Sequence, residues 1–224
     1  MPAPITSEFF DSYAHDFDAI YGTRHGLVNR FANRYLRKSM RLRYEKTLAG
    51  CRPIEGRTVI DVGCGPGHYS VALATMGAAR VVGLDFAPRM IDIAAEKARR
   101  AGVADRCRFV SADVLTYSTE EAYDYAVVMG FMDYVEEPRR LVEWVLSNTK
   151  SRAVFSFPAE GGLLAWQRKL RYRLRCPLFL YTRDRLELLL SNLPRADVRI
   201  ERIARDYFVT VELDRPAGRG RPVE

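Results

Sequence analysis

Between residues 57 and 158, short apolar segments alternate with segments of helical length. The apolar segments occupy 57–63, 80–85, 107–113, 123–130 and 152–158, and helix-like segments occupy 66–77, 88–101 and 138–149. Parallel strands need a crossover of a dozen or more residues, usually a helix, whereas antiparallel strands need only a short turn. The alternation therefore predicts an α/β fold, with right-handed crossovers and a mostly parallel sheet that is covered on both faces.

Both ends of the chain depart from this pattern. Residues 26–49 carry apolar side chains at helical spacing with arginines between them, and Gly50 and Pro53 follow as helix breakers. Residues 197–203 and 207–213 each alternate apolar and polar side chains and are separated by only three residues. This spacing predicts an antiparallel hairpin at the end of the fold.

Three successive predicted strands end in residues suited to ligand binding. The segment Asp61–Gly67 (DVGCGPG) follows the first strand, Asp85 ends the second and Asp113 ends the third. Ligands of open parallel sheets bind beyond the carboxyl ends of the strands, where an acid can accept both hydroxyls of a ribose. Glycine lets the backbone approach a ligand closely. Each feature alone could be a turn or a strand-end cap, but together they favour a nucleotide site.

The glycine spacing narrows the kind of nucleotide. A dinucleotide fingerprint needs G-x-G-x-x-G, but the glycines here are Gly63, Gly65 and Gly67, and His68 occupies the position of the third fingerprint glycine. The sequence also lacks the G-x-x-x-x-G-K-[ST] pattern of a phosphate-binding loop. A nicotinamide enzyme and a P-loop nucleotidase are therefore disfavoured.

Four segments, VIDVGCGPGHYS, VVGLDFAPRMI, FVSADV and YDYAVVMGF, resemble the successive motifs of class I S-adenosylmethionine-dependent methyltransferases. The stretch FDAIYG, ahead of the arginine-rich helix, is similar to small-molecule methyltransferases of the ubiquinone-biosynthesis and magnesium-protoporphyrin types. The resemblance implies a Rossmann-like, doubly wound, mostly parallel seven-stranded sheet with a C-terminal antiparallel hairpin and an N-terminal helical cap. It also implies S-adenosylmethionine as the cofactor and a small-molecule acceptor.

The resemblance further implies the residues that hold the cofactor. The glycine-rich segment would face the methionine part, with Asp61 orienting it. Asp85 would bind the ribose, Phe86 and the Asp113–Val114 pair would face the adenine, and strand four would end beside the sulfonium. A tyrosine of the N-terminal segment would close over the cofactor. The implied positions are Tyr13, Tyr21, Asp61, Gly63, Cys64, Gly65, Asp85, Phe86, Asp113, Val114, Met129 and Gly130.

No catalytic residue is implied, because methyl transfer from a sulfonium mainly requires a positioned acceptor and the exclusion of water. A general base is needed only for a weakly acidic hydroxyl. The candidates for that role or for substrate contact are His25, Asp133 and Tyr134, whereas His68 is expected to form part of the loop-to-helix turn. The four cysteines show no metal-ligand spacing, so we expect no metal.

We predict a single domain over residues 1–224. Its parts are an N-terminal helical cap (1–52), a cofactor-binding core (53–157), a basic aromatic insertion that caps the substrate (158–196), a closing hairpin (197–213) and a tail (214–224).

The positive charge of the chain lies mostly outside the predicted core. The net charge is +7, yet residues 53–150 contain 11 basic and 14 acidic residues. Nine basic residues lie between Arg24 and Arg52, and a second basic cluster interleaved with aromatic residues lies at 168–175. These segments are either solvated faces or attract an anionic or lipid-like acceptor or an anionic membrane surface.

The alternative function is an RNA or protein methyltransferase that uses the basic helix and insertion. Methylation of nucleic-acid bases is disfavoured, because strand four ends in Met129-Gly130-Phe131-Met132 and not in an Asn/Asp-Pro-Pro-aromatic motif. The start of the chain lacks a secretory pattern, so we expect a cytoplasmic protein, with peripheral contact at the inner membrane surface as an extension of that expectation.

Overall fold

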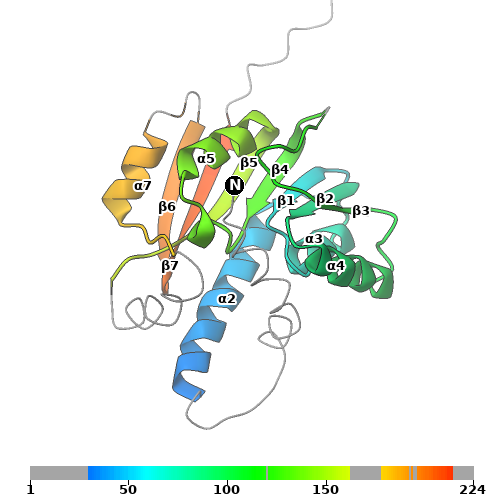
Figure 1. Cartoon of the computed structure of the whole chain (residues 1–224), viewed down its shortest axis with the longest axis horizontal. Coiled ribbons are helices and arrows are strands. Elements are labelled where there is room, and N and C mark those ends of the chain that lie inside the picture. Colours follow the sequence, from blue (N-terminus) through cyan, green and yellow to red (C-terminus); the bar gives the residue numbers. More distant parts are fainter. Residues whose placement is uncertain (1–29, 120, 162–177, 192, 194–195, 214–224) are drawn as a thin grey trace, which may run out of the picture.

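In the computed structural model, the described residues are 30–119, 121–161, 178–191, 193 and 196–213, with side chains from Ser39 onward. They form one seven-stranded sheet in the order β3-β2-β1-β4-β5-β7-β6 (Figure 1). The strands are β1 (Thr58–Val62), β2 (Arg80–Asp85), β3 (Cys107–Ser111), β4 (Tyr123–Val128), β5 (Thr149–Pro158), β6 (Ala196–Ile203) and β7 (Asp206–Leu213). The first five strands pair in parallel and the last two are antiparallel, which confirms the predicted fold class.

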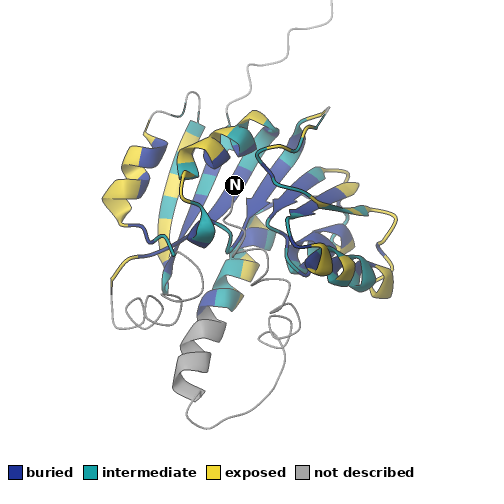
Figure 2. Ribbon diagram, in the orientation of Figure 1, coloured by how far each residue is buried: buried dark blue, intermediate teal, exposed yellow. Residues whose placement is uncertain are grey.

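Two layers of helices cover the sheet. The helices are α2 (Arg30–Gly50), α3 (His68–Thr75), α4 (Pro88–Arg100), α5 (Pro138–Ser147) and α7 (Arg183–Leu190). Successive strand residues alternate between two apolar clusters: Ile60 packs with residues of α5 and α7, whereas Val59 packs with residues of α2, α3 and α4. The central strands are therefore buried on both faces (Figure 2), as expected for a doubly wound sheet.

The closing hairpin turns more tightly than its sequence predicts. β7 starts at Asp206, so only Ala204 and Arg205 connect the two strands, and Ala204 adopts a left-handed φ of 50°. Asp206 is consequently the first residue of β7, paired with Pro158 at the end of β5, and is 3% exposed. The sequence pattern had placed this residue in the turn.

Two described parts of the predicted insertion, at Ala159 and at Phe179–Tyr181, lie beside the carboxyl edge of the sheet. Ala159 and Tyr181 form a parallel bridge, and the Tyr181 amide donates to the Pro158 carbonyl at 2.9 Å. The Phe179 amide donates to the carbonyl of Asp133 in the short 3-10 helix η2 (Met132–Tyr134), which the sequence pattern did not predict. Residues 1–29 of the predicted N-terminal cap and the basic cluster at 168–175 lie outside the described residues. Within the described part of the chain, no helix is long and apolar enough to cross a membrane.

Candidate functional site

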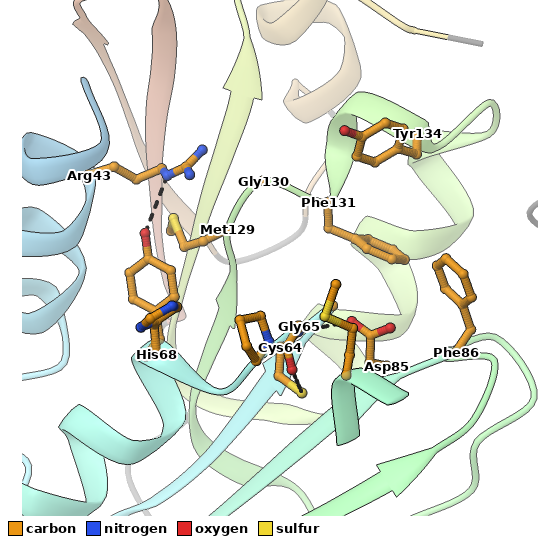
Figure 3. Close-up of a pocket in the computed structure, with 14 residues that line it drawn as sticks. Arg43, Cys64, Gly65, His68, Asp85, Phe86, Met129, Gly130, Phe131 and Tyr134 are labelled. Carbon is orange, nitrogen blue, oxygen red and sulfur yellow. Dashed lines mark hydrogen bonds between the residues drawn. The ribbon is translucent and has the colours of Figure 1, made fainter. Parts of the chain in front are cut away.

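An open cleft lies at the carboxyl ends of β1, β2 and β4, where the sequence predicts a ligand site (Figure 3). Its volume, solvent-facing space included, is about 640 Å³. It is lined by Arg43, Gly63, Cys64, Gly65, Pro66, His68, Tyr69, Asp85, Phe86, Met90, Met129, Gly130, Phe131 and Tyr134. The lining therefore comes from α2, from the turns after β1, β2 and β4, and from the starts of α3 and α4.

The turn after β1 depends on glycine for two different reasons. Gly63 has a φ of 67°, and a Cβ there would come within 2.3 Å of the Phe131 ring. Gly65 has a φ of 50°, but a Cβ there would meet nothing within 4 Å. Gly63 thus makes room for a neighbouring side chain, whereas the space beside Gly65 is open in the cleft. An open space above a backbone turn is what a closely bound ligand requires.

Asp85 links the glycine turn to the next helix. Its Oδ2 accepts from the Gly65 amide at 2.9 Å, and its Oδ1 accepts from the Ala87 amide at 3.0 Å, just before α4. A carboxylate can accept about four hydrogen bonds, and these are two of them. The carboxylate is held at the rim of the cleft in a fixed orientation, suited to accepting from a pair of neighbouring hydroxyls.

Asp61 lies beneath the turn and is fully buried. Its Oδ2 accepts from the Ser70 hydroxyl of α3 at 2.6 Å, and its Oδ1 has no hydrogen-bond partner in the described structure. Burial raises the pKa of Asp61 to about 7, an effect that the Ser70 hydrogen bonds oppose and the charge of Asp85 reinforces. Asp61 therefore fastens the end of β1 to α3 and does not line the cleft.

Arg43 closes the cleft on the side away from Asp85 and Phe86 (Figure 3). Its side chain is 13% exposed, and its Nε lies 3.3 Å from the Tyr69 hydroxyl. The end of the guanidinium lies over Gly130, whose φ is 72° and where a Cβ would be 3.4 Å from Nη1. A guanidinium at this position can pair with an anionic group of a ligand.

The structure brings most of the predicted contact residues to one place. Gly63, Cys64, Gly65, Asp85, Phe86, Met129 and Gly130 all line the cleft, as do the candidate Tyr134 and the turn residue His68. His68 begins α3, as predicted, and its ring nitrogens lie 3.3 and 3.4 Å from the Lys97 Nζ. Tyr13, Tyr21 and His25 lie outside the described residues.

Three further predicted residues lie near the cleft but are not among its lining. Asp113 accepts from the Leu115 amide through Oδ1 at 3.0 Å, which is the turn-forming arrangement that its sequence position also allowed. Val114 is 7% exposed and packs in the core, and Asp133 is 5% exposed within η2. The position of a residue after its strand therefore does not decide whether its side chain faces the cleft; packing and local hydrogen bonds decide this.

Sequence reasoning did not select Arg43, Pro66, Tyr69, Met90 or Phe131, which complete the lining. Arg43 is one of nine basic residues between Arg24 and Arg52, and nothing in the pattern separates it from the others. Among the described residues, no group of three or more acidic, histidine or cysteine side chains could hold a metal ion.

Comparison with known proteins shows that the central part of this chain is similar to methyltransferases. A family model described as a methyltransferase domain matches residues 59–151. The ubiquinone biosynthesis O-methyltransferase of Paracidovorax citrulli is 32% identical over an alignment of 119 residues that covers 48% of this chain and 50% of that protein. The ribosomal protein L11 methyltransferase of an Enterobacter species is 45% identical over 53 residues, or 24% of this chain and 18% of that protein. The alignments cover only about half the length of the ubiquinone biosynthesis O-methyltransferases to which this chain is similar.

A solved structure extends the likeness over nearly the whole chain. The magnesium protoporphyrin IX methyltransferase of Synechocystis PCC 6803, with bound SAH, superposes with a TM-score of 0.74. The alignment covers 94% of this chain and 99% of that one at 20% identity, which establishes a shared fold. Residues 59–151 are therefore similar to a methyltransferase domain, in agreement with the resemblance that the sequence motifs carry, and the chain shares the fold of this solved methyltransferase.

Proposed function

We propose that this chain transfers a methyl group from S-adenosylmethionine to a small-molecule acceptor. One observation carries the proposal: a glycine turn with open space beside Gly65 lies next to the Asp85 carboxylate, which is held by the amides of Gly65 and Ala87. The family match and the solved relative with bound SAH support the same reading.

The residues of the cleft fit the parts of this cofactor in order. Asp85 accepts the ribose hydroxyls and Phe86 packs on the adenine. The turn from Gly63 to Gly65 receives the middle of the molecule, and Met129 at the end of β4 faces the sulfonium. Arg43, on the opposite side, pairs with the carboxylate of the amino-acid end, because it is a little-exposed cation that lines the cleft.

The assignment extends to residues near the cleft. The Ala112 amide donates to the Asp85 carbonyl at 2.9 Å, so Asp113 and Val114 follow directly beside the adenine end. Asp61 orients the glycine turn from below through Ser70. The proposed parts of the chain are a cofactor-binding core at residues 53–157 and a substrate cap at 158–196. The described residues Phe179 and Tyr181 of that cap hydrogen-bond to the backbone of η2, whose last residue, Tyr134, lines the cleft.

When bound, the cofactor supplies an electrophilic methyl group on a good leaving group. The protein's tasks are to hold the acceptor atom in line with that group and to exclude water. Tyr134 and His68 are titratable side chains of the described lining, and Asp133 is the buried residue of η2 that directly precedes Tyr134. A phenolate or carboxylate acceptor would need no dedicated base.

The proposed acceptor is small and either hydrophobic or anionic. The relatives named for ubiquinone biosynthesis and for magnesium protoporphyrin IX support this choice. The ribosomal protein methyltransferase shares only a short segment with this chain and gives little support to the protein alternative. Peripheral contact with an anionic membrane is a further part of the proposal, and it rests on the basic sequence at 168–175.

Titration calorimetry tests the proposal directly. We expect S-adenosylmethionine and S-adenosylhomocysteine to bind at micromolar concentrations and to compete with each other, and NAD to give no heat. Transfer of a labelled methyl group to a panel of quinols, phenols and carboxylates would then identify the acceptor class. A folded protein that binds neither sulfur nucleoside would contradict the proposed function.

A further inference from the structure

Asp206 is a buried carboxylate behind the arginine that lines the cleft. It is the first residue of β7, and its side chain is 5% exposed. Its Oδ2 accepts from the Ser39 hydroxyl of α2 at 2.9 Å and lies 3.9 Å from the Nη1 of Arg43. Removing one partner of a buried ion pair leaves an uncompensated charge, so each of these two side chains stabilises the position of the other.

Three elements hold the Arg43 guanidinium in one orientation. The Arg43 Nε donates to the Tyr69 hydroxyl of α3, Gly130 lies beneath the guanidinium in the turn after β4, and Asp206 lies beside Nη1. A guanidinium is planar and its five N–H donors have fixed directions. Contacts on one edge of the group therefore decide which donors face the cleft.

We propose that Asp206 is a positioning residue, which holds Arg43 over Gly130 so that the guanidinium can bind the carboxylate end of the cofactor. This inference rests on the proposed function and on the role given there to Arg43. It makes the tight corner of the closing hairpin part of the binding site, although Asp206 does not line the cleft.

Asp206 could also act only as a counter-charge to Arg43, and this alternative predicts the opposite effect on cofactor binding. A carboxylate 3.9 Å from the guanidinium also lowers the positive potential that a ligand carboxylate meets. If Asp206 acted only as a counter-charge, its neutralisation would tighten cofactor binding. If it positions Arg43, its neutralisation lets a long, flexible side chain turn toward water and weakens binding.

The experiment compares two nucleosides on the whole chain by calorimetry. S-adenosylhomocysteine has the amino-acid end, whereas 5′-methylthioadenosine keeps the adenine, ribose and thioether and lacks that end. We expect Asp206→Asn to lower the affinity for S-adenosylhomocysteine about tenfold, as for the loss of one charge-assisted hydrogen bond. The affinity for 5′-methylthioadenosine should change by less than about twofold. The double variant with Arg43→Gln should bind S-adenosylhomocysteine no more weakly than Arg43→Gln alone.

A matched control separates positioning from general packing of the hairpin. Lys46 and Glu201 form a second ion pair between α2 and the hairpin, at 2.7 Å, and neither residue lines the cleft. Glu201→Gln should leave both affinities unchanged. If Asp206→Asn does not fold, Ser39→Ala takes its place, with an expected loss of about threefold that again affects only S-adenosylhomocysteine.

The outcomes distinguish the inference from the function on which it rests. Wild-type protein that binds neither nucleoside overturns the proposed function, and the inference falls with it. Wild-type binding to both, with Asp206→Asn tighter or unchanged for S-adenosylhomocysteine, overturns the inference alone. An equal loss of affinity for both nucleosides also overturns the inference, as does a loss in the double variant that adds to that of Arg43→Gln. Either result would mean that Asp206 stabilises the fold in general and does not act through Arg43.

Discussion

Replacing Asp85 by alanine tests the centre of the proposed site. The substitution removes the acceptor of the Gly65 and Ala87 amides, at 2.9 and 3.0 Å, together with the proposed acceptor of the ribose hydroxyls. A hydrogen bond to a charged group contributes about 1.5–3 kcal/mol. Two such bonds to the ribose at the lower value amount to about 3 kcal/mol, or roughly a hundredfold in affinity.

Calorimetry with S-adenosylhomocysteine and its 2′-deoxy analogue would show where the loss arises. Wild-type protein should bind the deoxy analogue more weakly than the parent compound. Asp85→Ala should bind both compounds weakly and nearly equally, because the acceptor of the missing hydroxyl is gone. A variant that still discriminates between the two compounds as the wild type does would refute the ribose contact.

Asp124 provides the matched control for Asp85. It also accepts from a backbone amide, that of Thr58 at 2.9 Å, but near the amino ends of β1 and β4, at the opposite edge of the sheet. Asp124→Ala should lower the free energy of unfolding and leave cofactor affinity unchanged. An equal loss of affinity in both variants would mean that Asp85 acts through general stability.

Three further outcomes are expected. The carboxyl of Asp61 has a pKa of about 7 in the folded protein and an ordinary value of 3.8. Because the folded protein binds the extra proton between these pH values, the free energy of unfolding should fall as the pH rises from 4 to 8. In urea unfolding, Asp61→Asn should reduce this fall, and an unchanged dependence on pH would contradict the prediction. Gly65→Ala should lower the free energy of unfolding only by backbone strain of about 1–2 kcal/mol and should weaken cofactor binding. Gly63→Ala should lower the free energy of unfolding further, because the added Cβ also meets the Phe131 ring. Equal losses of stability in the two variants would contradict this geometry. Sedimentation with anionic vesicles at low salt should disappear when the four basic residues between positions 168 and 173 become glutamine, and equal sedimentation of both proteins would exclude that membrane contact.

The sequence alone determined the elements of the core and the position of its main ligand turn. Apolar strand segments and helical segments have different periods, so their alternation defines the parallel sheet without tertiary information. The sequence also predicts the positions of Asp85 and of the glycine turn after β1, because the carboxyl ends of neighbouring parallel strands meet at one edge of the sheet. Met129 and Gly130 follow from the same rule, and all of these residues line the cleft.

Only the tertiary structure decided what happens between elements that are distant in the chain. Ser39 and Asp206 are 167 residues apart and meet because α2 packs against the closing hairpin. No local pattern distinguishes Arg43 among the basic residues of its helix, or Asp206 from a residue of the hairpin turn, since burial depends on which surfaces meet. Asp113 shows that a correct position along the chain does not fix the direction of a side chain. It follows β3 at the predicted edge of the sheet, yet its carboxylate accepts from the Leu115 amide. The strands and helices of the core are encoded in short segments, whereas side-chain direction at the site depends on packing among all of them.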